Sequence, residues 1–173
     1  MRIGITGKPR VGKSTIINAV ITRLKAEEIA VSGMLTADIS EGGRRIGFAL
    51  EDIHTGKKGT LAHIHPRYTG PRVGKYVVNL TDLESIGARA ITNALTQPGI
   101  LIVDEIGPME LKSKKFIEAV EEAIERGKPM IVSVHQRSEH GLVTRVKKEF
   151  EMVEVTEENR NGMASRIIPR IGR

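Results

Sequence analysis

Near its beginning the chain reads Gly7-Lys8-Pro9-Arg10-Val11-Gly12-Lys13-Ser14, which fits the pattern G-x-x-x-x-G-K-[S/T]. Residues 1–6 before it are short and alternating, as in a strand, and apolar residues recur at helical spacing within 15–24 after it. A strand, a glycine-rich loop and a helix in this order are the context in which the pattern binds phosphate. The sequence therefore predicts a phosphate-binding loop (P-loop) for a nucleoside polyphosphate; the plainer alternative is a glycine-rich turn before an ordinary helix.

The predicted loop has a clear chemistry. Glycines let successive backbone N–H groups point inward, and a helix N-terminus adds unpaired N–H groups and a partial positive charge. We expect Lys13 to reach the β- and γ-phosphates as a catalytic residue, and the Ser14 hydroxyl to ligate Mg²⁺. Arg10 could touch phosphate, although a solvated loop charge is the favoured interpretation. The predicted nucleotide-binding residues of this segment are Gly7, Lys8, Pro9, Arg10, Val11, Gly12, Lys13, Ser14 and Thr15.

Length and composition indicate an ordinary folded domain. The chain has 173 residues of average hydrophobic content, which predicts one domain over 1–173 with a sizeable core. It contains no apolar run of about 18 residues, so no membrane span is expected. Because the first predicted strand begins at Met1, we expect no signal peptide and a cytoplasmic location. The absence of Cys excludes disulfides, thiolate metal sites and cysteine nucleophiles.

The chain is basic, with a net charge of +6 and a sequence pI near 9.7. Such a balance has two interpretations: a nucleic-acid-binding face, or a basic surface with no partner beyond nucleotide. Only two Tyr and three Phe are present and Trp is absent, so platforms for stacking bases are not expected. The second interpretation is favoured, and nucleic acid stays a possible partner.

The first half of the chain predicts an antiparallel meander. Strands are expected at 29–38, 45–52 and 60–64, joined by glycine-containing turns. Residues 65–75, rich in Pro, Gly and cations, are the candidate mobile loop, and a strand follows at 76–80. Thr81 and Glu84 then match a capping box at the start of a helix that ends before Pro98.

The second half alternates strands and helices. Residues 100–103 are fully apolar, as expected for a central parallel strand covered on both faces. Further strands are expected at 129–134 and, at an edge, 151–156; the expected helices are 111–126, 138–150 and 159–168. This alternation predicts the α/β class: a three-layer α/β/α P-loop fold whose sheet is mostly parallel and carries the meander as an insertion.

Two acids, Asp104 and Glu105, follow the apolar strand 100–103. In P-loop enzymes an acid at the end of a neighbouring strand completes the Mg²⁺ site, a role that suits Asp104. Glu105, one residue later, can orient and deprotonate a water in line with the γ-phosphate, which favours hydrolysis over transfer. The alternative is a pair of solvated acids at a strand end.

The segment Val103-Asp104-Glu105-Ile106-Gly107-Pro108-Met109-Glu110-Leu111 resembles the signature of the thermophilic-type nucleoside-triphosphatase family. The resemblance implies Mg²⁺-dependent hydrolysis of ATP, GTP and other nucleoside triphosphates to diphosphate and phosphate, with weak discrimination between bases. It also implies a catalytic glutamate. Ser14-Thr15 stands where many members carry two threonines, and either hydroxyl can bind Mg²⁺. Agreement also runs through Thr6–Ser14, Gly33–Thr36, Gly47-Phe48, Gly70-Pro71, Val73–Tyr76, Val134-His135, Arg137-Ser138 and Glu158–Arg160.

Six further polar residues are possible site residues. His135 and Arg137 follow a buried strand, where a polar side chain can sense the γ-phosphate; a solvated loop is the equal alternative. Cations can stabilise charge on the transferred phosphoryl group, and an amide can contact the base. The residues considered for these roles are Arg72, Lys75, Arg160 and, for the base, Asn159.

Two other functions stay open at this point. A nucleotide or small-molecule kinase could use the same P-loop, with 65–75 as a small lid over an acceptor. A nucleotide-gated or RNA-associated protein would explain the basic balance. The sequence does not fix the oligomeric state, the base preference or the cellular process.

Overall fold

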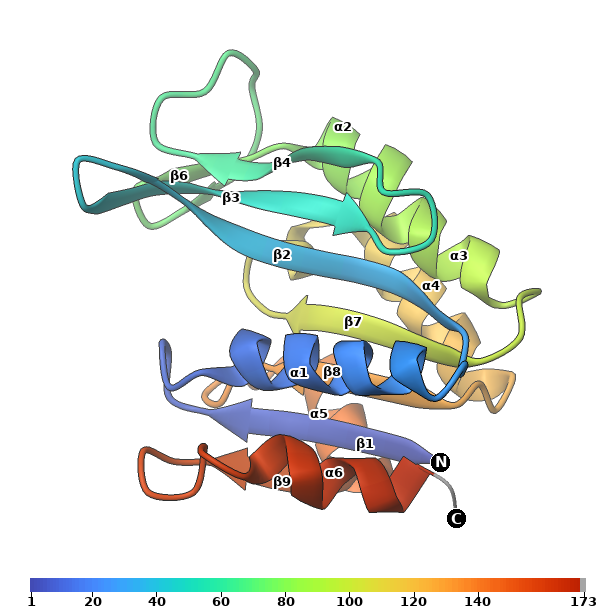
Figure 1. Cartoon of the computed structure of the whole chain (residues 1–173). Coiled ribbons are helices and arrows are strands. Elements are labelled where there is room, and N and C mark those ends of the chain that lie inside the picture. Colours follow the sequence, from blue (N-terminus) through green and yellow to red (C-terminus); the bar gives the residue numbers. More distant parts are fainter. Residues whose placement is uncertain (172–173) are drawn as a thin grey trace.

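The computed structural model describes residues 1–171 and is built on one nine-stranded sheet. The strands lie side by side in the order β5-β6-β4-β3-β2-β7-β8-β1-β9 (Figure 1). Their bounds are β1 Arg2–Gly7, β2 Val31–Glu41, β3 Arg44–Asp52, β4 Lys58–His63, β5 Arg72–Val73, β6 Tyr76–Val78, β7 Ile100–Ile106, β8 Met130–Val134 and β9 Glu151–Val155.

One half of the sheet is parallel. β2 pairs with β7, β7 with β8, β8 with β1, and β1 with the edge strand β9, all in the same direction. The central strand β8 is buried at all five positions, as its apolar sequence requires. β7 extends to Ile106, so the prediction of a strand over 100–103 was too short: Asp104 and Glu105 lie within the strand end, where its register against β8 shifts.

The other half of the sheet is the predicted antiparallel meander. β2 pairs with β3, β3 with β4, and β4 with β6. The turn between β2 and β3 places Gly42 and Gly43 at φ of 58° and 76°, a conformation that two glycines adopt without strain. Residues 65–75, expected to be a loop, contain the short strand β5, which pairs with β6.

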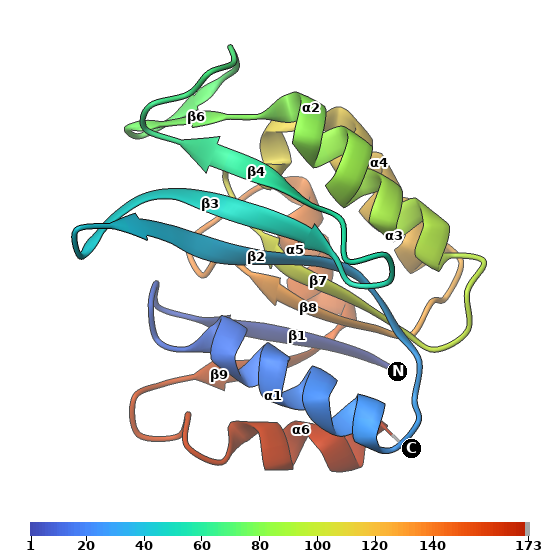
Figure 2. The ribbon, with the colours of Figure 1, turned by 45° about the horizontal axis from the view of Figure 1, so that its top comes forward.

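Helices cover both faces of the sheet, which makes three layers (Figure 2). On one face, α1 (Lys13–Ala26) and α6 (Met163–Ile171) pack over the parallel strands around Ile17 and Ile167. On the other, a continuous helical stretch packs with α4 (Lys114–Glu125) and α5 (Gly141–Glu149). That stretch consists of α2 (Leu80–Asp82), the π-helical segment η1 (Leu83–Ala88) and α3 (Arg89–Ala94).

The predicted capping box at Thr81 and Glu84 was wrong. The helix starts earlier, because the side chain of Asn79 accepts the N–H of Asp82 at 3.0 Å and caps it. Glu84 instead accepts the hydroxyl of Ser113 at 3.3 Å and pairs with Lys115. A tertiary contact to α4 therefore uses the carboxylate that the local pattern assigned to the cap.

The boundaries of the later helices also differ from the predictions, and α5 starts at Gly141 rather than at 138. Residues 110–112 form a separate 3₁₀ turn (η2, Glu110–Lys112), and Ser113 breaks from it in an extended conformation to cap α4 through the N–H of Phe116. The closing helix does not start at 159 or end before Pro169; it runs from Met163 to Ile171 with Pro169 inside. Since Pro169 and Ser165 are exposed, water can solvate the carbonyl that the proline leaves unpaired.

Candidate active site

The P-loop joins β1 to α1 with a backbone that only glycine allows at its first position. Gly7 has φ of 152°, and a Cβ there would lie 2.6 Å from the carbonyl oxygen of Val155. Gly12, at φ of 112°, is the N-cap residue of α1 and provides no side-chain cap. Val11 anchors the loop in the core with 6% exposure. The first turn of α1 therefore has no side-chain cap, which leaves its N–H groups available to an anion.

Lys13 lies over this loop, with only 9% of the residue exposed. Its Nζ donates to the carbonyl oxygens of Gly7 at 3.1 Å and Lys8 at 3.4 Å. The same Nζ is 3.8 Å from Oε2 of Glu105. The ammonium group thus stands between the loop and the acid at the end of β7, where a phosphate bound to the loop would meet both.

Asp104 is buried against the neighbouring strand, with 2% exposure. Its Oδ1 accepts the hydroxyl of Ser133 from β8, and its Oδ2 is buried with no hydrogen-bond partner within residues 1–171. Burial raises the pKa of Asp104, while the hydroxyls of Ser133 and Ser14 and the charge of Lys13 lower it. An orphaned carboxylate oxygen next to Ser14 fits a hard cation such as Mg²⁺, which takes oxygen ligands and keeps several waters.

Glu105 is less enclosed, with 27% of its side chain exposed. Burial raises its pKa, the charge of Lys13 opposes that shift, and the nearby Asp104 adds to it. A carboxylate with a raised pKa is a better proton acceptor near neutral pH than an ordinary one. The acid can therefore serve as a base toward a water that lies in front of the phosphate.

A third acid, Glu110, belongs to this site, although sequence reasoning assigned it no role. It is 4% exposed, and burial, with the charges of Glu105 and Asp104, raises its pKa to about 8. Gly107 lies against the side chains of both glutamates. A Cβ atom at this position would be 2.7 Å from Oε1 of Glu105 and 3.3 Å from Oε2 of Glu110, so both carboxylates approach the same point. One signal in the sequence could have indicated its burial: Glu110 is the one acid in an otherwise uncharged segment, with Ile106–Met109 before it and Leu111 after it.

The structure separates the six lesser candidates into groups. Arg72, His135 and Arg137 line one cavity of about 470 Å³. Arg160 lies against the P-loop, with Nη1 3.5 Å from the carbonyl oxygen of Val11. The amide of Asn159 is engaged at both ends, with the N–H of Thr156 and the carbonyl of Glu154. Lys75 lies on the β5–β6 turn, its Nζ 5.6 Å from the ring of Tyr76.

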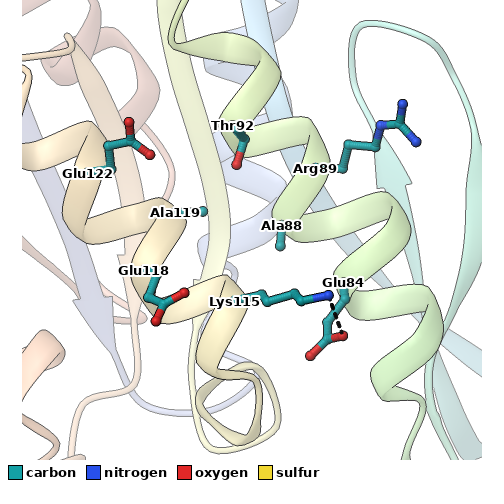
Figure 3. Close-up of a pocket in the computed structure, with 8 residues that line it drawn as sticks. All are labelled: Glu84, Ala88, Arg89, Thr92, Lys115, Glu118, Ala119 and Glu122. Atoms are coloured by element: carbon teal, nitrogen blue, oxygen red, sulfur yellow. Dashed lines mark ion pairs between the residues drawn. The ribbon is translucent and has the colours of Figure 1, made fainter.

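A second cavity, of about 340 Å³, lies between the η1–α3 stretch and α4 (Figure 3). Glu84 and Lys115 pair across it at 3.7 Å, and Glu118 and Glu122 add two more carboxylates. It contains no residue of the P-loop and neither acid of β7, so it is not the nucleotide site. No cluster of three or more His, Asp or Glu suited to a metal occurs in residues 1–171. Within the same residues, none of the helices has the length and apolarity needed to span a bilayer.

An anion-binding loop that faces a strand-end Asp–Glu pair in a three-layer α/β/α fold defines the class of protein: a P-loop nucleoside-triphosphatase. Comparison with known proteins agrees. The model of the NTPase family matches residues 2–168. Nucleoside-triphosphatase THEP1 of Methanosarcina acetivorans is 44% identical over 171 residues, which cover 98% of this chain and 96% of that protein.

Solved structures give the same result. The crystal structure of THEP1 from the hyperthermophile Aquifex aeolicus superposes with a TM-score of 0.87 at 29% identity and covers all of both chains. The solution structure of a human cancer-related nucleoside triphosphatase gives 0.82 at 32% identity, covering 98% of this chain and 96% of the human one. The chain belongs to the NTPase family and is an enzyme that hydrolyses nucleoside triphosphates. The predicted family, fold class and activity are confirmed.

Proposed function

We propose that this enzyme uses Mg²⁺, accepts ATP, GTP and other nucleoside triphosphates with little preference for the base, and works in the cytoplasm. One observation carries the proposal: the ammonium group of Lys13 lies 3.8 Å from the carboxylate of Glu105, beside the unpartnered Oδ2 of Asp104. These groups supply a cation for the phosphates, a base for water and a ligand for the metal.

Ser14 and Asp104 would hold Mg²⁺, which neutralises charge on the β- and γ-phosphates when bound. Lys13 and the free backbone N–H groups of the P-loop and of the first turn of α1 hold the phosphate oxygens and stabilise the negative charge that spreads over them during the reaction. Glu105 orients the attacking water and takes its proton as the new oxygen–phosphorus bond forms and the bond to the β-phosphate oxygen breaks. Arg160, which lies against the loop, adds positive charge nearby.

The weak base preference is supported by Asn159. Because its amide oxygen and nitrogen already bond to the backbone of 154–156, this side chain is a poor reader of base edges. His135, whose pKa is lowered by burial and by the charge of Lys13, and Arg137 are candidates for contact with the γ-phosphate.

The test is Glu105→Gln, which keeps the shape of the side chain and removes the base. We expect nucleotide binding to be retained and release of phosphate from ATP, without any acceptor, to fall by about 10²–10⁴-fold. Glu118→Gln on the exposed side of α4 is the matched control, since within residues 1–171 its carboxylate pairs with Lys114 alone. Unchanged turnover in Glu105→Gln would remove this residue from the mechanism.

A further inference from the structure

The cavity of about 470 Å³ beside the active site has an unusual lining. Three cationic side chains and two imidazoles surround it: Arg72, Lys112, Arg137, His135 and His140. Among the described residues, no Asp or Glu lines it. None of these five groups forms an ion pair within residues 1–171. We call this cavity the cationic pocket.

The two imidazoles act here as donors. The backbone N–H of Arg137 donates to Nδ1 of His135 at 3.3 Å, and that of Leu142 donates to Nδ1 of His140 at 3.2 Å. With Nδ1 accepting, a neutral ring carries its proton on Nε2. Every titratable group of the pocket therefore offers N–H groups, and Arg72, Lys112 and Arg137 add positive charge. A ligand that matches them must present several acceptor oxygens.

Hydrogen bonds to β7 and α5 fix the backbone of the 135–140 loop, which carries both histidines of the pocket. The N–H of His135 donates to the carbonyl of Ile106 at 3.1 Å, which continues the pairing of β8 with β7. Lys147 from α5 donates to the carbonyl oxygens of Gln136 at 2.8 Å and Ser138 at 3.5 Å. The loop therefore presents its donors on a fixed backbone, so their convergence does not depend on a mobile segment.

The pocket borders the site of hydrolysis. His135 lies close enough to Lys13 for that charge, after burial itself, to lower its pKa. Pro108, three residues after Glu105, forms part of the lining. Val73 and Leu111 add apolar surface. A volume of about 470 Å³ falls within the range of about 300–1,000 Å³ typical of small-molecule pockets, so the space exceeds that of one bare phosphate.

We propose that the cationic pocket binds the phosphate dianion of a second small molecule, a phosphomonoester or released inorganic phosphate, while a nucleoside triphosphate occupies the P-loop. A phosphate dianion carries about two negative charges and three strong acceptor oxygens, which suit a set of donors from Arg72, Lys112 and the 135–140 loop. The apolar surface of Val73, Pro108 and Leu111 suits the body of an ester. The P-loop contributes no residue to this pocket, and Arg72, Lys112 and His140 have no role in the hydrolysis proposed above.

The test is calorimetric titration of the full chain, saturated with Mg²⁺ and a non-hydrolysable triphosphate analogue so that the P-loop is filled. The titrants are ribose 5-phosphate, inorganic phosphate and, as a control without phosphate, ribose. We expect binding of at least one phosphate titrant and none of ribose. Lys112→Glu should weaken that binding by about tenfold or more, because it replaces a charged donor with a repelling carboxylate.

If Lys112→Glu disturbs the structure of η2, a second variant, Arg72→Glu on β5, tests the same pocket from another element. Arg89→Glu is the matched control: it makes the same charge change on the exposed face of α3, at the other cavity. Tighter binding of ribose 5-phosphate than of phosphate supports a second phosphomonoester, and equal binding supports the released product. Absence of binding, or equal weakening by Arg89→Glu, would overturn the proposal. Loss of analogue binding, detected by displacement of a fluorescent nucleotide, would instead count against the proposed P-loop function.

Discussion

At the scale of the residue, burial determines the chemistry of this site. Asp104, Glu105 and Glu110 lie close enough for the charge of one acid to raise the pKa of another, and the ammonium group of Lys13 is at ion-pair distance from Glu105. The first two acids could be predicted, because they end a fully apolar strand opposite a P-loop. The role of Glu110 could not, since its burial arises only when η2 packs under the end of β7, a tertiary event that no local pattern records.

The raised pKa of Glu110, about 8, predicts a pH-dependent stability. The unfolded chain loses this proton near the ordinary glutamate pKa of about 4.3, so between there and about pH 8 the folded state holds one more proton. Stability must therefore fall as pH rises through that window, by up to about 1.4 kcal/mol per unit. Glu110→Gln does not titrate, so its free energy of unfolding relative to the parent should rise from pH 5 to pH 8 and then level off.

Urea denaturation at several pH values measures this difference. Glu118→Gln, an exposed acid on α4, supplies the baseline for loss of an ordinary carboxylate. A difference between Glu110→Gln and the parent that stays constant over the window would mean that Glu110 titrates normally in the folded protein.

At the scale of the element, the sequence predicts the type of segment better than its ends. β1, the P-loop and α1 form from adjacent residues, so their local pattern was sufficient. The predicted start of α2 was wrong because two residues that can cap a helix, Asn79 and Thr81, stand two positions apart. The choice between them depends on a tertiary contact, since Glu84 accepts the hydroxyl of Ser113 and does not complete a capping box with Thr81. The break at Ser113 was missed because no Gly or Pro stands within 111–126 to mark it.

The shape of the P-loop makes its own prediction. Gly7 and Gly42 both have positive φ, but a Cβ would lie 2.6 Å from a backbone oxygen only at Gly7 and would meet open space at Gly42. Gly42→Ala should cost about 1–2 kcal/mol of stability from its φ alone. Gly7→Ala should cost more, and it should weaken nucleotide binding, because Val155 or the loop must move. Equal losses in denaturant unfolding would show that the loop accommodates a side chain freely.

At the scale of the whole molecule, one sheet separates two apolar cores. Alternating strands and helices were enough to predict the three layers, since a parallel sheet buried on both faces needs both coverings. The cationic pocket could not be predicted as a unit, because Arg72 reaches it from β5 and His135 from the end of β8. In the sheet order these two strands are separated by β6, β4, β3, β2 and β7. Sequence reasoning had considered both residues, but nothing local connects them.

The prediction of a single domain over 1–173 can be tested through these two cores. Leu24 in α1 and Leu83 in η1 are each 0% exposed, on opposite faces of the sheet. Leu24→Ala and Leu83→Ala should each lower the free energy of unfolding by about 2–5 kcal/mol. Their effects should add in the double variant, because the sheet separates the two cavities. Since both faces share the same strands, circular dichroism and tyrosine fluorescence should report one coincident guanidinium transition in every variant. Of the two tyrosines, Tyr76 lies in the Leu83 core and Tyr68 donates its hydroxyl to the carbonyl of the neighbouring Val77. A Leu24→Ala protein whose circular dichroism falls before its tyrosine signal changes would divide the chain into two independently folding units.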